Sequence, residues 1–170
     1  ITNVVHRMTL TRTGDLRLNG QITRIYSRPD NDTVVHILNE HPQRFLGWIF
    51  LNPKNYADGS SKHIIDDLES YRAHPGMVGI KLHPHWHDYK TACLGPILTR
   101  ANDLELPVLI HLGFGKRGDF RSLCEQYPKV RFIAAHAGFP FYQFLWNQAS
   151  RYRNLWVDLS SPHIDEAIAR

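Results

Sequence analysis

Short apolar runs that end in a polar residue recur along this chain at a regular spacing. Four of them end at His83, His111, His136 and Asp158, which are 28, 25 and 22 residues apart. One strand with its following helix and connections occupies about this length. A single histidine at a strand end is usually an ordinary core residue, but four polar ends in phase with this period indicate repeated strand–helix units.

The intervening segments support this interpretation. Strands are predicted over residues 45–51, 79–83, 106–111, 130–136 and 154–158. Apolar residues at spacings of three and four predict helices over 33–40, 62–72, 91–104, 120–127 and 140–152, with one more beginning at 162. We expect the third helix to restart at Gly95-Pro96, the first to be capped by Asn31-Asp32, and the histidines after 83 to lie in a loop. The β-prone segments and turn residues within 1–30 predict one hairpin.

Strands that alternate with helices of about ten residues form a parallel sheet covered by helices. Two folds then compete, the doubly wound sheet and the (β/α)8 barrel, and both place their sites at the carboxyl ends of the strands. No Gly-x-Gly-x-x-Gly follows a strand, which argues against a dinucleotide site. Polar ends on four successive strands converge on one centre only if the sheet curls, so we predict the barrel.

Composition limits the remaining possibilities. The 170 residues, 42% of them hydrophobic, suffice for a single domain over 1–170. The basic residues behind the net charge of +4 are scattered, and no apolar run reaches the length of a membrane span, so neither nucleic acid nor membrane is an expected partner. Two widely spaced cysteines and the lack of a signal-like N-terminus predict a reducing, cytoplasmic setting. Eleven histidines are unusual, and histidine is the commonest metal ligand.

Three segments carry a family resemblance: Gly-Ile-Lys-Leu-His-Pro at 79–84, Leu-Pro-Val-Leu-Ile-His-Leu-Gly at 106–113 and Phe-Ile-Ala-Ala-His-Ala-Gly at 132–138. They closely resemble the amidohydrolase-related (amidohydrolase family 2) metal-dependent hydrolases. Segments 154–160, 41–45 and Asn52-Pro53 also look like that family. The resemblance implies an α/β fold, a (β/α)8 TIM-type barrel of which this chain covers roughly strands 2/3 to 7.

The resemblance also implies a metal centre. His111, at the end of strand five, would be a ligand of a divalent metal, expected to be zinc. His136, ending strand six, would be a second ligand or a catalytic histidine beside the metal. Lys81 matches the strand-four position, which in some branches is a carbamylated lysine that bridges two metals, and we expect it to be catalytic.

Other residues would face the substrate. By the same resemblance His83 and His85 line the substrate side. Arg117 or Lys116 would hold a substrate carboxylate, with an ordinary solvated loop as the alternative. Asp158 is not the family's metal-binding aspartate, and a structural hydrogen-bonding role is as good an interpretation for it.

Two departures from the family pattern affect the interpretation. The strand-one His-x-His pair is absent, and the strand-eight aspartate would lie beyond Arg170. A complete barrel takes about 250 residues. We therefore expect a fragment, or an ordered subset of a longer protein, and the third option is a degenerate relative that has lost its metal.

The resulting functional prediction is an enzyme that hydrolyses a small-molecule amide, lactone or ester with a metal-activated water. One alternative keeps the site and changes the reaction to non-oxidative decarboxylation, which branches of the family perform. The second is a non-catalytic barrel fragment that uses the aromatic segment 139–146 as a contact surface. The sequence leaves a homo-oligomer open.

Overall fold

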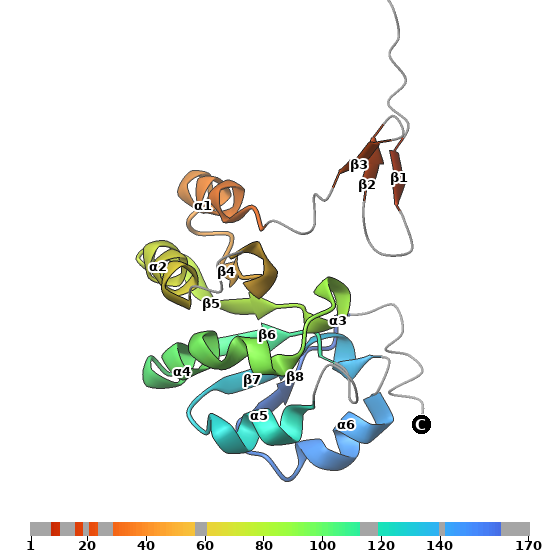
Figure 1. The fold of residues 1–170 in the computed structure, drawn as a ribbon. Helices are drawn as coiled ribbons and strands as arrows, with labels where there is room; N and C mark the ends of the chain where they lie inside the picture. Colours follow the sequence, from red (N-terminus) through yellow and green to blue (C-terminus); the bar gives the residue numbers. More distant parts are fainter. Residues whose placement is uncertain are drawn as a thin grey trace, which may run out of the picture.

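A five-stranded parallel sheet forms the centre of the structure. The computed structural model describes residues 29–56, 61–112, 119–139 and 142–160, and the backbone of 8–10, 16–18 and 21–23. The strands, in their order across the sheet, are β4 (Gly47–Phe50), β5 (Met77–Leu82), β6 (Pro107–Ile110), β7 (Arg131–Ala134) and β8 (Leu155–Val157). Spatial order follows chain order without reversal, so the colours of Figure 1 change steadily across the sheet. A doubly wound sheet reverses its order at one point, whereas this one is part of a TIM-type barrel, as predicted.

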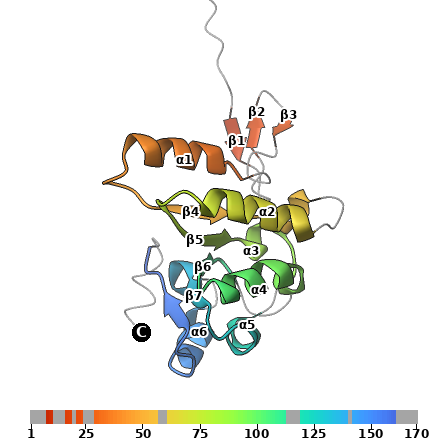
Figure 2. The same ribbon diagram turned by 90° about the vertical axis from the view of Figure 1, so that its left-hand side faces the viewer.

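Helices connect the strands. They are α1 (Asn31–Glu40), α2 (Ser61–Arg72), α3 (Pro84–His87), α4 (Gly95–Asp103), α5 (Phe120–Gln126) and α6 (Tyr142–Ala149), with single turns η1 (Pro53–Asn55), η2 (Thr91–Leu94) and η3 (Ala135–Gly138). Figures 1 and 2 show α4 and α5 on the same side of the sheet. The predicted restart at Gly95-Pro96 is confirmed, because η2 ends and α4 begins there.

The two faces of the sheet differ in burial. One row across the strands is almost wholly buried and packs under the helices: Ile49, Ile80, Val108, Phe132 and Leu155. The next row points to the other face, since side chains alternate along a strand, and its members are only partly buried or exposed: Phe50, Lys81, Leu109, Ile133 and Trp156. The core therefore lies between sheet and helices, and Lys81 lies on the inner face of the barrel wall.

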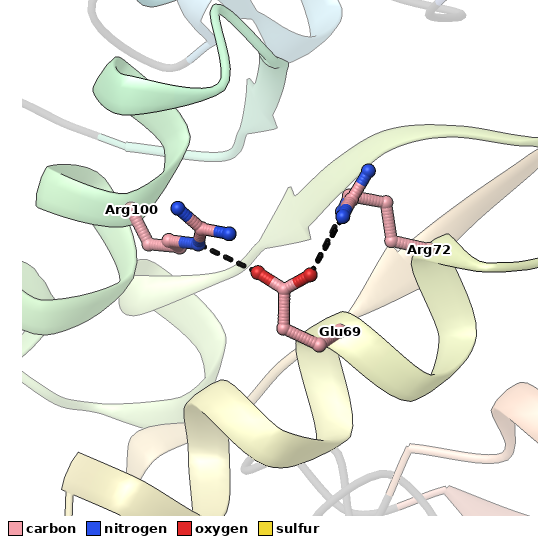
Figure 3. A network of polar contacts seen from close by, with 3 residues as sticks. All are labelled: Glu69, Arg72 and Arg100. Carbon is pink, nitrogen blue, oxygen red and sulfur yellow. Dashed lines mark hydrogen bonds and ion pairs between the residues drawn. The ribbon is translucent and has the colours of Figure 1, made fainter.

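An ion-pair network joins two neighbouring helices on the outside of the sheet. Glu69 of α2 accepts hydrogen bonds from Arg100 of α4 at 2.6 Å and from Arg72 at 2.7 Å (Figure 3). The bond from Arg100, followed by that from Arg72, lowers the pKa of the Glu69 carboxyl. The network is about one-third exposed, so we expect it to align α2 with α4 at a modest gain in stability.

We predict that Glu69→Gln and Arg100→Gln are coupled by about 0.5 to 1 kcal/mol in a double-mutant cycle. Urea unfolding of the wild type, both single variants and the double variant measures this coupling. Because the pair is partly exposed, 1 M salt should reduce the coupling energy. Additive single effects would show that the network contributes nothing beyond its separate residues.

Three sequence-based expectations need correction. The N-terminal segment contains three antiparallel strands rather than one hairpin, β1 (Met8–Leu10), β2 (Leu16–Leu18) and β3 (Gln21–Thr23). The cap of α1 is Asp30, whose carboxylate accepts the Thr33 N–H at 3.1 Å, so the predicted cap residues Asn31 and Asp32 are the first two residues of the helix itself. The histidines after β5 lie in the short helix α3, because Pro84 at its first turn is preorganised for a helix. The helix predicted from 162 lies outside the described residues.

Candidate active site

Three histidines meet where neighbouring strands end. His83 follows β5, His111 follows β6 and His136 follows β7, and parallel strands bring these ends to the same edge of the sheet. The ring centroids of His83 and His111 are 4.3 Å apart, and those of His111 and His136 are 5.2 Å apart. The His85 ring stacks on His111 at 5.4 Å. The structure thus brings four of the predicted site histidines into one cluster.

Helix α3 fixes the orientation and the tautomer of His83. The His83 side chain caps the helix, because its Nδ1 accepts the Trp86 N–H at 3.0 Å. The proton of the neutral ring must then be on Nε2. Its own main-chain N–H donates to the Tyr89 hydroxyl at 3.2 Å. Burial, assisted by the neighbouring His111 and Lys81, lowers the pKa of His83 to about 2, so the ring is a neutral N–H donor.

His111 has the same tautomer, but its hydrogen bond is made by the other ring nitrogen. Its Nε2 lies 3.2 Å from the Phe139 carbonyl oxygen, which can only accept, so Nε2 carries the proton. Its Nδ1 is buried and has no hydrogen-bond partner among the described residues. Burial lowers the pKa of His111 to about 4, and Lys81 and His136 contribute in the same direction. A buried lone pair without a partner is costly unless a ligand uses it.

A left-handed turn presents His136. The φ angles of His136, Ala137 and Gly138 are 54°, 56° and 81°. Residues with a Cβ adopt this region at an energetic cost. The end of β8 holds the turn, since the Ala137 N–H donates to the Asp158 carbonyl at 2.6 Å. His136 Nδ1 contacts the Ser160 carbonyl oxygen and donates to it, which leaves the lone pair on Nε2.

Lys81 is a half-buried cation beside these histidines. Burial lowers the pKa of its ammonium to about 8, against an opposing effect of Asp158. Lys81 forms no salt bridge within the described part of the chain. The Asp158 carboxylate instead accepts the Ser160 N–H at 2.8 Å and its hydroxyl at 2.7 Å. Asp158 therefore has the structural role that the sequence left open, and Lys81 remains available to an anion.

Comparison with known proteins agrees with this geometry. The family model described as Amidohydrolase matches residues 17–169. The chain belongs to the amidohydrolase family. No curated protein matches it. Of the helices in the described ranges, none is long and apolar enough to cross a membrane.

Solved structures similar to this amidohydrolase chain share its fold. An uncharacterized TIM-barrel protein from Bordetella bronchiseptica matches with a TM-score of 0.60 and 19% identity, over 76% of this chain and 48% of that one. A 4-oxalomesaconate hydratase from Rhodopseudomonas palustris matches with a TM-score of 0.58 and 21% identity, over 82% of this chain and 51% of that one. A 5-carboxyvanillate decarboxylase from Sphingomonas paucimobilis matches with a TM-score of 0.57 and 14% identity, over 85% of this chain and 57% of that one. The amidohydrolase chain thus spans about half the length of these structures.

The donor atoms can be tested against the divalent metal that the family resemblance implies. His111 offers a buried lone pair on Nδ1 while a main-chain carbonyl holds its other nitrogen, and His136 is held in the same way. Metal-binding histidines are typically oriented by such a second hydrogen bond. The described residues contain no group of three or more histidine, cysteine, aspartate or glutamate side chains arranged to hold a metal. The two histidines therefore fit part of a metal site.

The sequence missed several residues of the site. Tyr89 supports the His83 main chain with its hydroxyl, and the carbonyls of Phe139 and Ser160 fix two tautomers. No sequence signal marks the two carbonyls, because any residue type supplies one. Tyr89 follows Asp88, whose φ of 52° ends α3 and turns the chain inward. Arg117 and Lys116 lie outside the described residues, so their predicted contact with a substrate carboxylate stays a prediction.

Proposed function

We propose that the chain carries part of the active site of a metal-dependent hydrolase that acts on a small-molecule amide, lactone or ester. The observation behind this proposal is the His111 Nδ1 lone pair, buried and without a partner in the described part of the chain, on a ring oriented through its other nitrogen. His136 would be the second ligand through Nε2. A catalytic zinc usually takes three protein ligands, so we expect at least one more from outside the described residues.

A bound divalent metal, with zinc as the expected ion, would supply an activated water near neutral pH. The chain's own residues would orient the substrate toward it. The His83 Nε2–H is a neutral donor suited to a carbonyl or acyl oxygen. His85, stacked on His111, would line the same side. Lys81 would attract the negative charge of the substrate from the inner face of the barrel wall.

A second reaction is favoured by one observation, the cation of Lys81. An ammonium without a salt bridge in the described residues, on the inner face, suits a substrate carboxylate. Two of the similar structures are named as decarboxylases, of 5-carboxyvanillate and of 2,6-dihydroxybenzoate. Non-oxidative decarboxylation of an aromatic acid is therefore the alternative. Release of CO2 from aromatic acids, compared with proton release from lactones and esters and amine release from amides, separates the two reactions in the full-length protein.

We predict that His111→Asn lowers the zinc content of the full-length protein at least tenfold after dialysis, because asparagine removes the imidazole lone pair. The matched control is His36→Asn, since His36 is 71% exposed on α1 and remote from the cluster. Elemental analysis of both variants and the wild type is the measurement. Retention of stoichiometric zinc by His111→Asn would remove His111 from the metal site.

We predict that Lys81→Met leaves the fold near native but lowers kcat/KM of the full-length protein at least tenfold. Methionine keeps the unbranched stem of lysine and loses the charge. Lys81 forms no salt bridge with a described residue, so its loss leaves no buried carboxylate there unpaired. Steady-state kinetics and the urea midpoint test the two parts separately. A kcat/KM within a factor of about two, under 0.5 kcal/mol, would assign Lys81 to the barrel rim as a solvated residue.

A further inference from the structure

A cavity lies apart from the histidine cluster. Its volume is about 580 Å³, and it is bordered by η1, α2, the segment after α3, η2 and α4. The described residues that line it include Tyr56, Ile64, Tyr89, Cys93, Pro96 and Ile97. None of the five histidines His83, His85, His87, His111 and His136 is among its lining residues. The cavity is therefore a separate feature from the proposed active site.

The walls of this cavity are rigid and mostly apolar. Ile64, Tyr89 and Ile97 are at most 5% exposed, so they are held by the core behind them. Pro53 and Pro96 stand in the first turns of η1 and α4, where the fixed φ of proline limits movement. Small-molecule sites are largely preformed hollows of about 300 to 1,000 Å³ with apolar and aromatic walls. The size and walls of the cavity fit that description.

The charges at the cavity define the ligand. Lys54 and Lys90 both line it, both are exposed, and neither forms a salt bridge with a described residue. Asp88 is the acidic residue among the lining residues, so the charge there is net positive. Tyr56 and Tyr89 add aromatic residues to the apolar lining, which suits a flat apolar group. An apolar ring with one negative group matches both the walls and the charges.

We infer that this cavity binds a small amphipathic anion, meaning an aromatic or alicyclic ring system with one carboxylate or sulfonate. The ring packs between the apolar walls, and the acid group meets Lys54 and Lys90. Tyr89 connects the cavity with the histidine cluster, since its ring lines the cavity and its hydroxyl accepts the His83 N–H. The inference stands independently of the proposed reaction, because it uses none of the residues assigned to the metal.

Cys93 provides a direct measure of occupancy. It is exposed and lines the cavity, whereas Cys124 is buried, and burial raises the pKa of the Cys124 thiol to about 12. Iodoacetamide should therefore alkylate Cys93 selectively. The probe is 8-anilinonaphthalene-1-sulfonate, a ring system with one sulfonate. At saturation it should slow the alkylation of Cys93 in the full-length protein at least fivefold, as measured on the Cys93 peptide.

Two variants and one neutral analogue locate the binding. Ala92→Trp places a large side chain at the exposed lining residue Ala92 and should abolish the protection. The double variant Lys54→Gln/Lys90→Gln should raise the concentration needed for protection about tenfold, whereas Lys129→Gln, a remote exposed lysine, should not. N-phenyl-1-naphthylamine, which lacks the sulfonate, should protect at least tenfold more weakly.

Three outcomes would overturn the inference that the cavity binds such an anion. If the dye becomes fluorescent while Cys93 reacts at its unprotected rate, the dye binds elsewhere and the cavity is no site for such an anion. Equal protection by the neutral analogue, or protection unaffected by removal of both lysines, would also overturn it. The lysine variant keeps the test decisive if Ala92→Trp does not fold, because surface lysines can be replaced without disturbing the core.

Discussion

An alanine at position 138 is expected to lower the free energy of unfolding by about 2 to 4 kcal/mol. The φ of Gly138 is 81°, which costs a residue with a Cβ about 1 kcal/mol or more. An added Cβ would also lie 2.4 Å from Leu145 Cδ2 and 3.1 Å from Leu145 Cβ. Leu145 is fully buried in α6, so it has little room to move, and such overpacking costs about 1 to 3 kcal/mol.

Urea unfolding of Gly138→Ala measures this loss, with Gly95→Ala as the matched control. Gly95 begins α4 with φ −44° and ψ −56°, and no atom lies within 4 Å of its added Cβ. Alanine at 95 should therefore be neutral or slightly stabilising, because it favours the helix. If both alanine variants unfolded at the wild-type urea concentration, the left-handed turn after β7 would be wrong.

The metal-free chain is expected to lose about 2 kcal/mol of stability through His83 alone between pH 7 and pH 5. The folded-state pKa of His83 is lowered to about 2 by burial, whereas a histidine in the unfolded chain titrates near 6.5. Below pH 6.5 the unfolded chain thus binds a proton that the folded chain does not. Stability then falls by about 1.4 kcal/mol for each pH unit. His111, with its pKa of about 4, adds to the loss in the same direction.

Urea unfolding at pH 7 and pH 5, with a chelator present, tests this dependence. The matched variant is His83→Asn, because an asparagine oxygen can still accept the Trp86 N–H at the start of α3 but does not titrate in this range. Its stability should change less than that of the wild type between the two pH values. The hydrogen-bonded carboxyls of Glu69 and Asp119 have lowered pKa values, so their contribution is lost only below about pH 4. Identical pH dependence in the two proteins would contradict the burial of a neutral His83.

The sheet was predictable from sequence because its signal is local and repeated. Four of the five strands fall inside the predicted runs, and β5 begins at Met77, two residues before its predicted start. The choice of a barrel rested on polar residues at successive strand ends. The errors came from competing local interactions. Asp30 takes the Thr33 N–H one residue before the predicted cap. His83 uses its ring nitrogen as a helix cap, a role that few histidines have, so a helix was predicted as a loop.

The site was predictable only in part. The resemblance and the strand period selected His83, His111 and His136, which the fold brings together. Which nitrogen of each ring carries the proton depends on the Trp86 N–H and on two main-chain carbonyls. Such partners are set by backbone geometry and leave no trace in residue type. The cavity apart from the histidine cluster was not foreseen for the same reason, because it lies between two stretches, 53–64 and 88–97, whose packing depends on the fold.

The left-handed backbone at His136 bears on how this site can evolve. A histidine at φ 54° is conformationally disfavoured, and glycine or asparagine would fit the same turn more easily. Drift under selection for folding alone should therefore replace this histidine early, with a gain in backbone stability. Its persistence in a lineage would mark a selected activity, and its loss to glycine or asparagine would mark copies of the gene released from that selection.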